Sequence, residues 1–502
     1  MASLTSRSMT AAMWGAAGSA VRVILQLATQ ILLARILGPA EFGIFAIGAI
    51  VISFSNFFAD VGMAYGLIQK QKVSKEDVRF IFTWQFIIGA ITTSIIIGSS
   101  DVIAQFFGNE RAHDIVSALS ILCFIHALTA PSTNILKRNL DYKPLQIGQI
   151  VGYVVGYILV GLPLALLGYG VWSLVIAWII LATTNLAFVY DKVRHEVKPL
   201  FWFEGCHGLM RYGVAVFFTN ILNWIILNID RTLVGRHFPA IEMGLYSTAY
   251  NILYNPTGTL VGAVQPVFFS ASATVSEDVN RIRSAYETLI STTLLLFLPC
   301  FVFMAAISDT IILALYGKQW AAAAGAFRPF ALAMPLYIFT ALTTPIIWTS
   351  GRGLREFTSQ IPLVIIWVSA CWLAVGYSMT TMAWTVLGLY ALRSIVIGRE
   401  AMRATGITLL RIFMAIRGAV LLSAAVAAAA LFCDTSARQI SSNVSVWITL
   451  DILIFSLVFV AMIRYVPITV SPGSIMLLNQ LNARLPSRYA QIIPRLFHRR
   501  GS

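Results

Sequence analysis

The chain has 502 residues, of which 58% are hydrophobic and 11% are charged, and its mean hydropathy is +0.80. Soluble domains carry roughly 25% charged residues, so this composition excludes an ordinary soluble protein. The net charge of +14 would suggest nucleic-acid binding in a soluble chain, but here we attribute it to basic loops beside a membrane. We therefore expect no nucleic-acid partner.

Fourteen apolar stretches follow one another along the chain, and most approach the ~20 residues that cross a bilayer as helix. Backbone groups in lipid must be hydrogen-bonded within their own segment, which requires helices. The sequence therefore predicts an all-α polytopic membrane protein with about fourteen transmembrane helices. The expected spans are 11–33, 43–67, 80–98, 113–133, 147–167, 171–190, 212–234, 244–268, 286–307, 328–349, 361–376, 379–397, 410–432 and 444–463.

Basic residues fall mainly on alternate connections between these spans. With the N-terminus in the cytoplasm, 27 of the 35 Lys and Arg residues lie on the cytoplasmic side and seven lie on the other side. Positive charge retains loops in the cytoplasm, so this skew predicts that both termini are cytoplasmic. For a bacterial chain, the expected location is the cytoplasmic (inner) membrane.

A motif after the first span recurs about two hundred positions later, after the seventh. Pro39-Ala40 matches Pro239-Ala240, and Gly43-Ile44-Phe45 matches Gly244-Leu245-Tyr246 with one inserted residue. The first and seventh spans run in the same direction, so the repeat predicts two pseudo-symmetric six-helix bundles related by an axis along the membrane normal. A substrate path between the bundles follows from this arrangement.

The repeat sets the expected domain boundaries: an N-terminal six-helix bundle at 1–205, a C-terminal six-helix bundle at 206–400, an additional helix pair at 401–470 and a basic cytoplasmic tail at 471–502. The tail carries apolar residues at helical spacing followed by arginines. Two readings stay open for it: a segment attracted to anionic lipid of the inner leaflet, or a disordered tail.

Arg22 lies near the middle of the first span, where insertion of an arginine costs roughly 2.5–3.5 kcal/mol. Its neighbours at intervals of three and four residues are also polar, so one face of this helix avoids lipid. We interpret Arg22 either as a cation facing the substrate or as a partner of Asp60 in the second span. The polar face consists of Ser19, Arg22, Gln26, Thr29 and Gln30.

Other polar residues at membrane depth complete the candidate substrate-binding set. Asn56 shares a helix face with Asp60, while Asn220 and Asn223 occupy the seventh span. Tyr250 belongs to a stripe at intervals of four, Tyr246, Tyr250 and Tyr254. Such a stripe suits either packing or the stacking of a sugar ring.

Three further charges are interpreted as coupling or structural groups. Asp230 and Arg231 are adjacent at the end of the seventh span, where an interfacial anchor competes with a ligand site. Asp451 lies seven residues into the last span and suits either a coupling ion or helix packing. The chain has no catalytic constellation, no metal-ligand spacing and no phosphate-binding glycine loop, so we expect no enzyme activity, metal or cofactor.

Four stretches carry a resemblance to a known family: 32–45 (Leu-Leu-Ala-Arg-Ile-Leu-Gly-Pro-Ala-Glu-Phe-Gly-Ile-Phe), 58–69, 136–143 and 228–250. Together they resemble the polysaccharide-transporter (Wzx-type) branch of the MOP flippase superfamily. The resemblance implies a flippase for polyprenyl-diphosphate-linked oligosaccharides in exopolysaccharide, capsule or O-antigen synthesis. It also implies that a polysaccharide polymerase and export machinery are functional partners of the protein.

The residues add a mechanism to this resemblance. Arg22 would attract the diphosphate, Gln26, Gln30 and the asparagines would bond sugar hydroxyls, and rocking of the two bundles would open a polar cleft to each side in turn. A multidrug exporter of the same superfamily is the nearest alternative, followed by a peptidoglycan-precursor flippase. A membrane glycosyltransferase or polymerase is less favoured because the external loops are short.

Overall fold

The computed structural model describes residues 4–60, 73–203, 206–274, 279–466 and 469–470. Within these residues the regular structure is helical, without β-strands. Eleven of the described helices are long and apolar enough to cross a bilayer. The prediction of an all-α, multi-pass membrane protein is confirmed, while the count of fourteen spans stays a prediction.

The chain forms two compact units. The first contains 1–248 and 368–379, and the second contains 249–367 and 380–502. The helices of the first unit are α1 (Leu4–Asp60), α3 (Lys75–Gly98), α4 (Ser100–Phe107), α5 (Arg111–Leu119), α6 (Ile121–Arg138), α7 (Tyr142–Tyr153), the π-helix η1 (Val154–Gly161), α8 (Leu162–Leu166), α9 (Val171–Val193) and α10 (Cys206–His237). Two helices, α11 (Ala240–Thr274) and α15 (Gly353–Ala374), contribute residues to both units.

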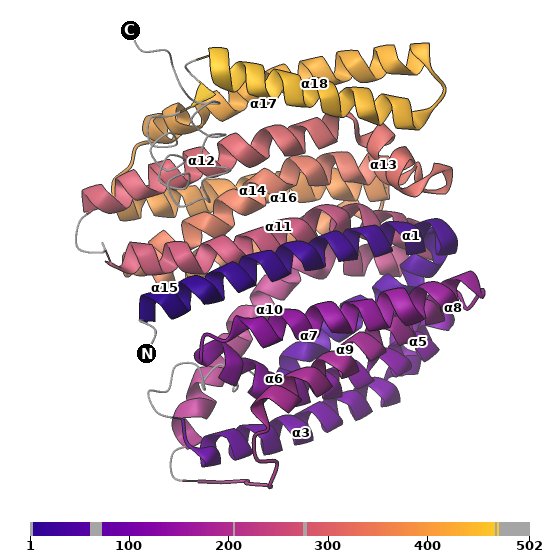
Figure 1. Cartoon of the computed structure of the whole chain (residues 1–502), viewed down its shortest axis with the longest axis vertical. Helices are drawn as coiled ribbons and strands as arrows, with labels where there is room; N and C mark the ends of the chain where they lie inside the picture. The colour runs from indigo at the N-terminus through magenta and orange to yellow at the C-terminus, as the bar shows by residue number, and fades with distance from the viewer. Residues whose placement is uncertain (1–3, 61–72, 204–205, 275–278, 467–468, 471–502) are drawn as a thin grey trace. The chain divides into compact units, whose positions relative to one another are not determined.

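The second unit is built mainly from helices after residue 278. They are α12 (Val279–Ala306), α13 (Ser308–Tyr316), the short η2 (Lys318–Trp320), α14 (Ala323–Thr349), α16 (Met379–Thr405), α17 (Leu409–Ile440) and α18 (Val444–Tyr465). Within this unit α12 packs against α14 and α17, while α18 packs against α17 and α13. Figure 1 shows α17 and α18 as an antiparallel pair joined by a short turn.

Helix α1 contains 57 residues and breaks once, at Gly38. Its length of roughly 85 Å at ~1.5 Å per residue far exceeds a ~30 Å hydrocarbon core. Gly38 has φ 76° and ψ 173°, a left-handed backbone that glycine adopts without strain, and Pro39 begins the next helical segment. The expected loop over 34–42 is therefore wrong: a single residue separates the two helical segments.

The two copies of the repeated motif touch each other inside the first unit. A Cβ atom placed on Gly43 would lie 1.7 Å from the carbonyl oxygen of Ala240, and one placed on Gly244 would lie 1.9 Å from the carbonyl oxygen of Pro39. Each glycine therefore packs against the backbone of the other copy. This reciprocal contact gives a packing reason for both glycines, and the internal repeat stays a prediction.

A buried apolar core joins α1, α5, α6 and α9 of the first unit. The π-helix η1 also approaches α9 closely: a Cβ on Gly156 of η1 would lie 2.4 Å from the carbonyl oxygen of Ala177 on α9. Close backbone approach of this kind is how membrane helices gain van der Waals contact. Among the core residues are Ile44, Ile52, Ile115, Leu119, Leu122 and Val175.

Glu41 ties three helices of the first unit together. Arg111 of α5 donates two hydrogen bonds to its carboxylate, of 2.8 and 2.9 Å, and the backbone N–H of Val171 at the start of α9 donates a third of 2.7 Å. The Glu41 side chain is 19% exposed and that of Arg111 is 57% exposed. The fork-shaped guanidinium matches the carboxylate, which fixes the directions of α1, α5 and α9 here.

Replacing Glu41 with glutamine is expected to lower the free energy of unfolding by about 1 kcal/mol, because charge-assisted hydrogen bonds are lost from a partly exposed site. The midpoint of thermal unfolding of the detergent-purified protein measures this. Asp191→Asn is a matched control, since Asp191 forms exposed ion pairs with Lys192 and Arg194. Equal midpoints for the two variants would contradict a structural role for Glu41.

Candidate functional site

The predicted polar face of α1 lies against α7 within the first unit. Arg22 Nη1 donates to Gln149 Oε1, and the hydroxyls of Thr29 and Tyr153 are 2.5 Å apart. Arg22 is half-buried and Thr29 is buried. The face therefore meets protein polar groups, as the periodicity predicted.

The partners on α7 form a stripe of their own, which sequence reasoning missed. Gln146, Gln149 and Tyr153 recur at intervals of three and four, and Tyr157 continues the stripe into η1. A Cβ on Gly18 of α1 would lie 2.5 Å from the side chain of Gln146, so the two helices are closely packed here. The same periodicity argument that was applied to α1 would have found these residues.

Arg22 keeps its positive charge without a counter-charge in the described part of the chain. The partner seen for its guanidinium is the neutral amide of Gln149, and no described carboxylate forms an ion pair with it. The proposed partner Asp60 belongs to α1, but its side chain lies outside the described residues. A cation held by a neutral amide remains attractive to an anion.

The structure places Gln26 and Gln30 half-buried on the same helix as Arg22. Asn56, in the second segment of α1, lies 3.2 Å from His126 Nδ1 of α6, measured from its Oδ1. On α10, Asn223 is half-buried, whereas the side chain of Asn220 lies outside the described residues. Asn56 therefore contacts α6, and Asn223 is partly covered by protein.

The charge pair at the end of the seventh span is embedded in the first unit. Asp230 is 2% exposed and accepts a hydrogen bond of 2.8 Å from the hydroxyl of Tyr246. Arg231 is half-buried and donates to the carbonyl of Leu227 and the side-chain oxygen of Asn228, both at 2.7 Å. Both side chains bond residues of α10 or α11, which suits a structural role.

Tyr250 lies in an aromatic cluster of the second unit. It is 1% exposed, stacks on Tyr254 with ring centres 5.0 Å apart and meets Phe330 edge-on at 5.3 Å. The half-buried Tyr254 continues the contact to Tyr337 at 5.4 Å. Because the Tyr250 ring is covered by other rings, the packing reading accounts for its environment.

The first unit also contains an apolar cavity of about 810 Å³. It is bordered by α1, α3, α4 and α10, and its lining is almost entirely hydrocarbon. Aliphatic and aromatic residues there suit a lipid chain better than a polar group. Its lining includes Ile50, Phe54, Ile88, Ile95, Phe106 and Trp224.

No group of three or more His, Cys, Asp or Glu side chains suited to a metal ion occurs in the described parts of the chain. The predicted charge Asp451 is fully buried on α18 in the second unit. The candidate site of the first unit is therefore a polar helix interface centred on Arg22, within the same unit as an apolar cavity.

Residues 32–325 match the family model described as "Polysaccharide biosynthesis protein". A succinoglycan biosynthesis transport protein, ExoT of Rhizobium meliloti, is 24% identical over 59% of this chain and 60% of its own length. The teichuronic acid biosynthesis protein TuaB of Bacillus subtilis is 23% identical over 79% of this chain and 82% of its own length. The first of these alignments thus leaves two fifths of the relative uncovered.

Solved structures share the fold at low sequence identity. The lipid II flippase MurJ, in an inward closed conformation, has a TM-score of 0.70 and 15% identity over 90% of this chain and 98% of that chain. An outward-facing multidrug resistance MATE transporter of the MOP superfamily has a TM-score of 0.56 and 15% identity over 80% of this chain and 96% of that chain. These likenesses establish the architecture and leave the cargo to other arguments.

Proposed function

Because this chain belongs to the polysaccharide biosynthesis protein family, we propose that it moves a polyprenyl-diphosphate-linked oligosaccharide from the cytoplasmic to the extracytoplasmic leaflet. Two relatives bear names from the synthesis of cell-surface polysaccharides, and one of these names denotes transport. The fold is that of MOP-superfamily transporters and a lipid II flippase. This combination supports transport of a glycan carrier rather than catalysis.

The half-buried guanidinium of Arg22 is the observation that carries the proposal. A diphosphate is insoluble in the acyl core, so its passage needs a positive group at membrane depth. Arg22 offers such a group in α1, and Gln149 holds one of its nitrogens, leaving other N–H groups of the guanidinium fork for phosphate oxygens. Gln26, Gln30 and Asn56 are the amides proposed for sugar hydroxyls.

The polyprenyl chain has different needs from the diphosphate. It is soluble in the bilayer, so it remains in lipid while the polar end crosses. The apolar cavity of the first unit, lined by residues such as Ile95 and Phe106, is a site where such a chain could lie. A polar helix interface and an apolar cavity in the same unit suit an amphipathic cargo.

The proposal includes the membrane arrangement expected from the charges. The chain would lie in the bacterial inner membrane with both termini in the cytoplasm and the basic tail 471–502, outside the described residues, near anionic lipid. The bundles at 1–205 and 206–400 would rock to give alternating access, and the pair at 401–470 would be additional. A polysaccharide polymerase and export machinery are the proposed functional partners.

The test is transfer of a fluorescent polyprenyl-diphosphate oligosaccharide in proteoliposomes of the purified protein, followed by quenching of the outer leaflet. We expect the labelled lipid to exchange between leaflets faster than in protein-free vesicles. A labelled lipid II and a fluorescent cationic drug are run in parallel. Movement of the drug alone would identify a multidrug exporter, and movement of lipid II alone a peptidoglycan-precursor flippase.

A further inference from the structure

The residue of α18 that is fully buried in the second unit is acidic. All residues of α18, Val444–Tyr465, are described, and Asp451 is the one that is buried, with 0% exposure. Its neighbours along the helix are apolar and mostly exposed, as expected for a helix that faces lipid. A helix whose fully buried residue carries a carboxyl group needs a reason beyond hydrophobic packing for that position.

A second carboxyl group lies beside Asp451 on the neighbouring helix. Asp434 of α17 lies six residues before the end of its helix, and Asp451 lies seven residues after the start of α18, so both are roughly 10 Å from the turn between them. The Asp451 carboxyl interacts there with the Asp434 carboxyl and the Cys433 thiol. The antiparallel pairing of α17 and α18 thus brings two acids together.

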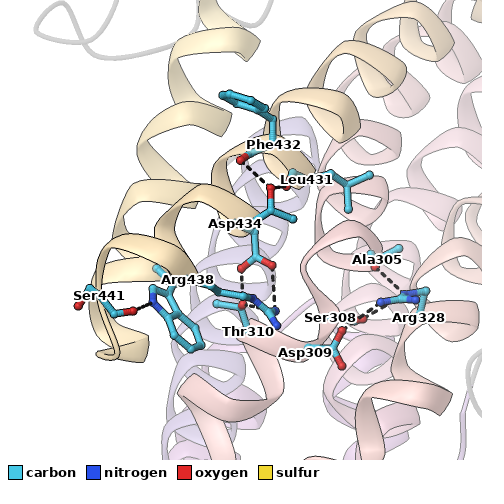
Figure 2. Close-up of polar contacts among 12 residues, drawn as sticks. Ala305, Ser308, Asp309, Thr310, Arg328, Leu431, Phe432, Asp434, Arg438 and Ser441 are labelled. Carbon is cyan, nitrogen blue, oxygen red and sulfur yellow. Dashed lines mark hydrogen bonds and ion pairs between the residues drawn. The ribbon is translucent and has the colours of Figure 1, made fainter.

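The two carboxyl groups have unequal partners. Figure 2 shows that Asp434 is held on both sides, by an ion pair of 2.9 Å with Arg438 and by a hydrogen bond from the hydroxyl of Thr310 on α13. Arg438 also donates to Thr310 at 2.9 Å. By contrast, no described N–H or O–H group donates to either oxygen of Asp451.

We propose that Asp451 is a proton-binding site whose occupancy controls the docking of α18 against α17. An ionised carboxylate that is buried with only a weak thiol donor nearby, beside a second carboxylate, is unfavourable, and a proton removes its charge. The one arginine at the cluster neutralises Asp434. The chemistry of the site is therefore that of a single exchangeable proton on the Asp434–Asp451 pair.

The groups that face this pair come from each packed helix. On α17 they are Cys433 and Arg438, and on α13 the hydroxyl of Thr310 faces Asp434, whereas Asp309 is turned to an exposed pair with Arg328. Helix α12 meets α18 through Phe303 and Phe455 and presents no charge there. Loss of the proton would leave one excess negative charge, which α18 relieves by moving Asp451 toward water.

The sign of the pH effect follows from proton counting. An unfolded aspartate is ionised above about pH 5, and on this proposal the native site keeps its proton there, so the folded state binds more protons. Stability should therefore fall as the pH rises from about 5 until the native site also loses its proton. For one proton, the equilibrium constant for folding falls by up to about tenfold for each pH unit.

The experiment is thermal unfolding of the full-length purified protein from pH 5 to 9 in sodium-free buffer. We expect the midpoint to fall with pH in the unmodified protein, to lose most of this slope in Asp451→Asn, and to keep it in the control Asp309→Asn. Infrared difference spectra should contain a protonated-carboxyl band that Asp451→Asn lacks. Asp451→Glu keeps a titratable group, so it should retain both the slope and the band.

Two results would overturn the assignment. The first is a slope and carboxyl band in Asp451→Asn equal to those of the unmodified protein. The second is a midpoint that responds to sodium at constant pH through Asp451, which would make the site one for a metal cation. Neither readout uses a transported lipid, so failure here is distinguishable from failure of the proposed function.

Discussion

Replacing Arg22 with alanine is expected to reduce export of the polysaccharide on the order of 10- to 100-fold while leaving the amount of protein in the membrane unchanged. A hydrogen bond to a charged group contributes about 1.5–3 kcal/mol, which corresponds to this range in affinity. Export is measured as cell-surface polysaccharide in a strain that depends on this protein. The rate of lipid transfer in proteoliposomes gives the same comparison without the cell.

The conservative variants separate charge from geometry at this position. Arg22→Lys keeps the charge but loses the planar fork, so it should be mild if a point charge suffices and severe if two phosphate oxygens are held at once. Gln149→Leu keeps Arg22 and removes its amide partner, and should have a smaller effect than Arg22→Ala. Arg399→Ala, at an exposed position on α16, is the matched control. Normal export by Arg22→Ala would remove Arg22 from the mechanism.

Alanine at Gly43 or Gly244 is expected to destabilise the first unit more than any other single change considered for this chain. The added Cβ would lie 1.7 or 1.9 Å from a backbone carbonyl oxygen of the matching motif, so the helices must separate. Overpacking of this kind costs about 1–3 kcal/mol or more because a backbone atom, unlike a flexible side chain, cannot turn away. We expect less protein in the membrane and a lower unfolding midpoint.

The control for this prediction is Gly388→Ala in α16, where no heavy atom of the described residues, apart from the adjoining backbone of α16, lies within 4 Å of the added Cβ. That change should be neutral or slightly stabilising, since alanine favours a helix by about 1 kcal/mol over glycine. Because Gly43 and Gly244 share one contact, the double variant should cost less than the sum of the single ones. Additive effects, or wild-type stability in either single variant, would contradict the contact.

The class of the protein was predictable because hydropathy and charge report directly on solvation. The motifs in 32–45 and 228–250 led to the right family, as the match over 32–325 confirms. Helix faces were also readable: the periodicity around Arg22 indicated a polar face, and α1 presents it to α7. Membrane class, family motifs and helix faces all depend on local sequence, so the spacing of residues is enough to predict them.

Partners and boundaries were harder to predict because they depend on tertiary packing. The pairing of Arg22 with Asp60 stays a prediction, because the Asp60 side chain lies outside the described residues, whereas the contact of Arg22 with Gln149, more than one hundred residues away, was not predicted. Asp451 was recognised, but its neighbour Asp434 was placed in a loop because the expected span ended at 432. Helix α17 continues to Ile440, so Asp434 lies inside it. Hydropathy marks where the apolar residues stop, and polar helical turns can extend beyond that point.

The single-residue break at Gly38 joins the two helical segments of α1 directly. No loop separates the segment that carries Arg22 from the segment that carries Gly43. A displacement of the end of the first segment also displaces Pro39, which begins the second segment and contacts Gly244 of α11. Arg22 and the matching motif of the second repeat are thus connected by helix and close backbone contact, with Gly38 as the one residue at which α1 can bend.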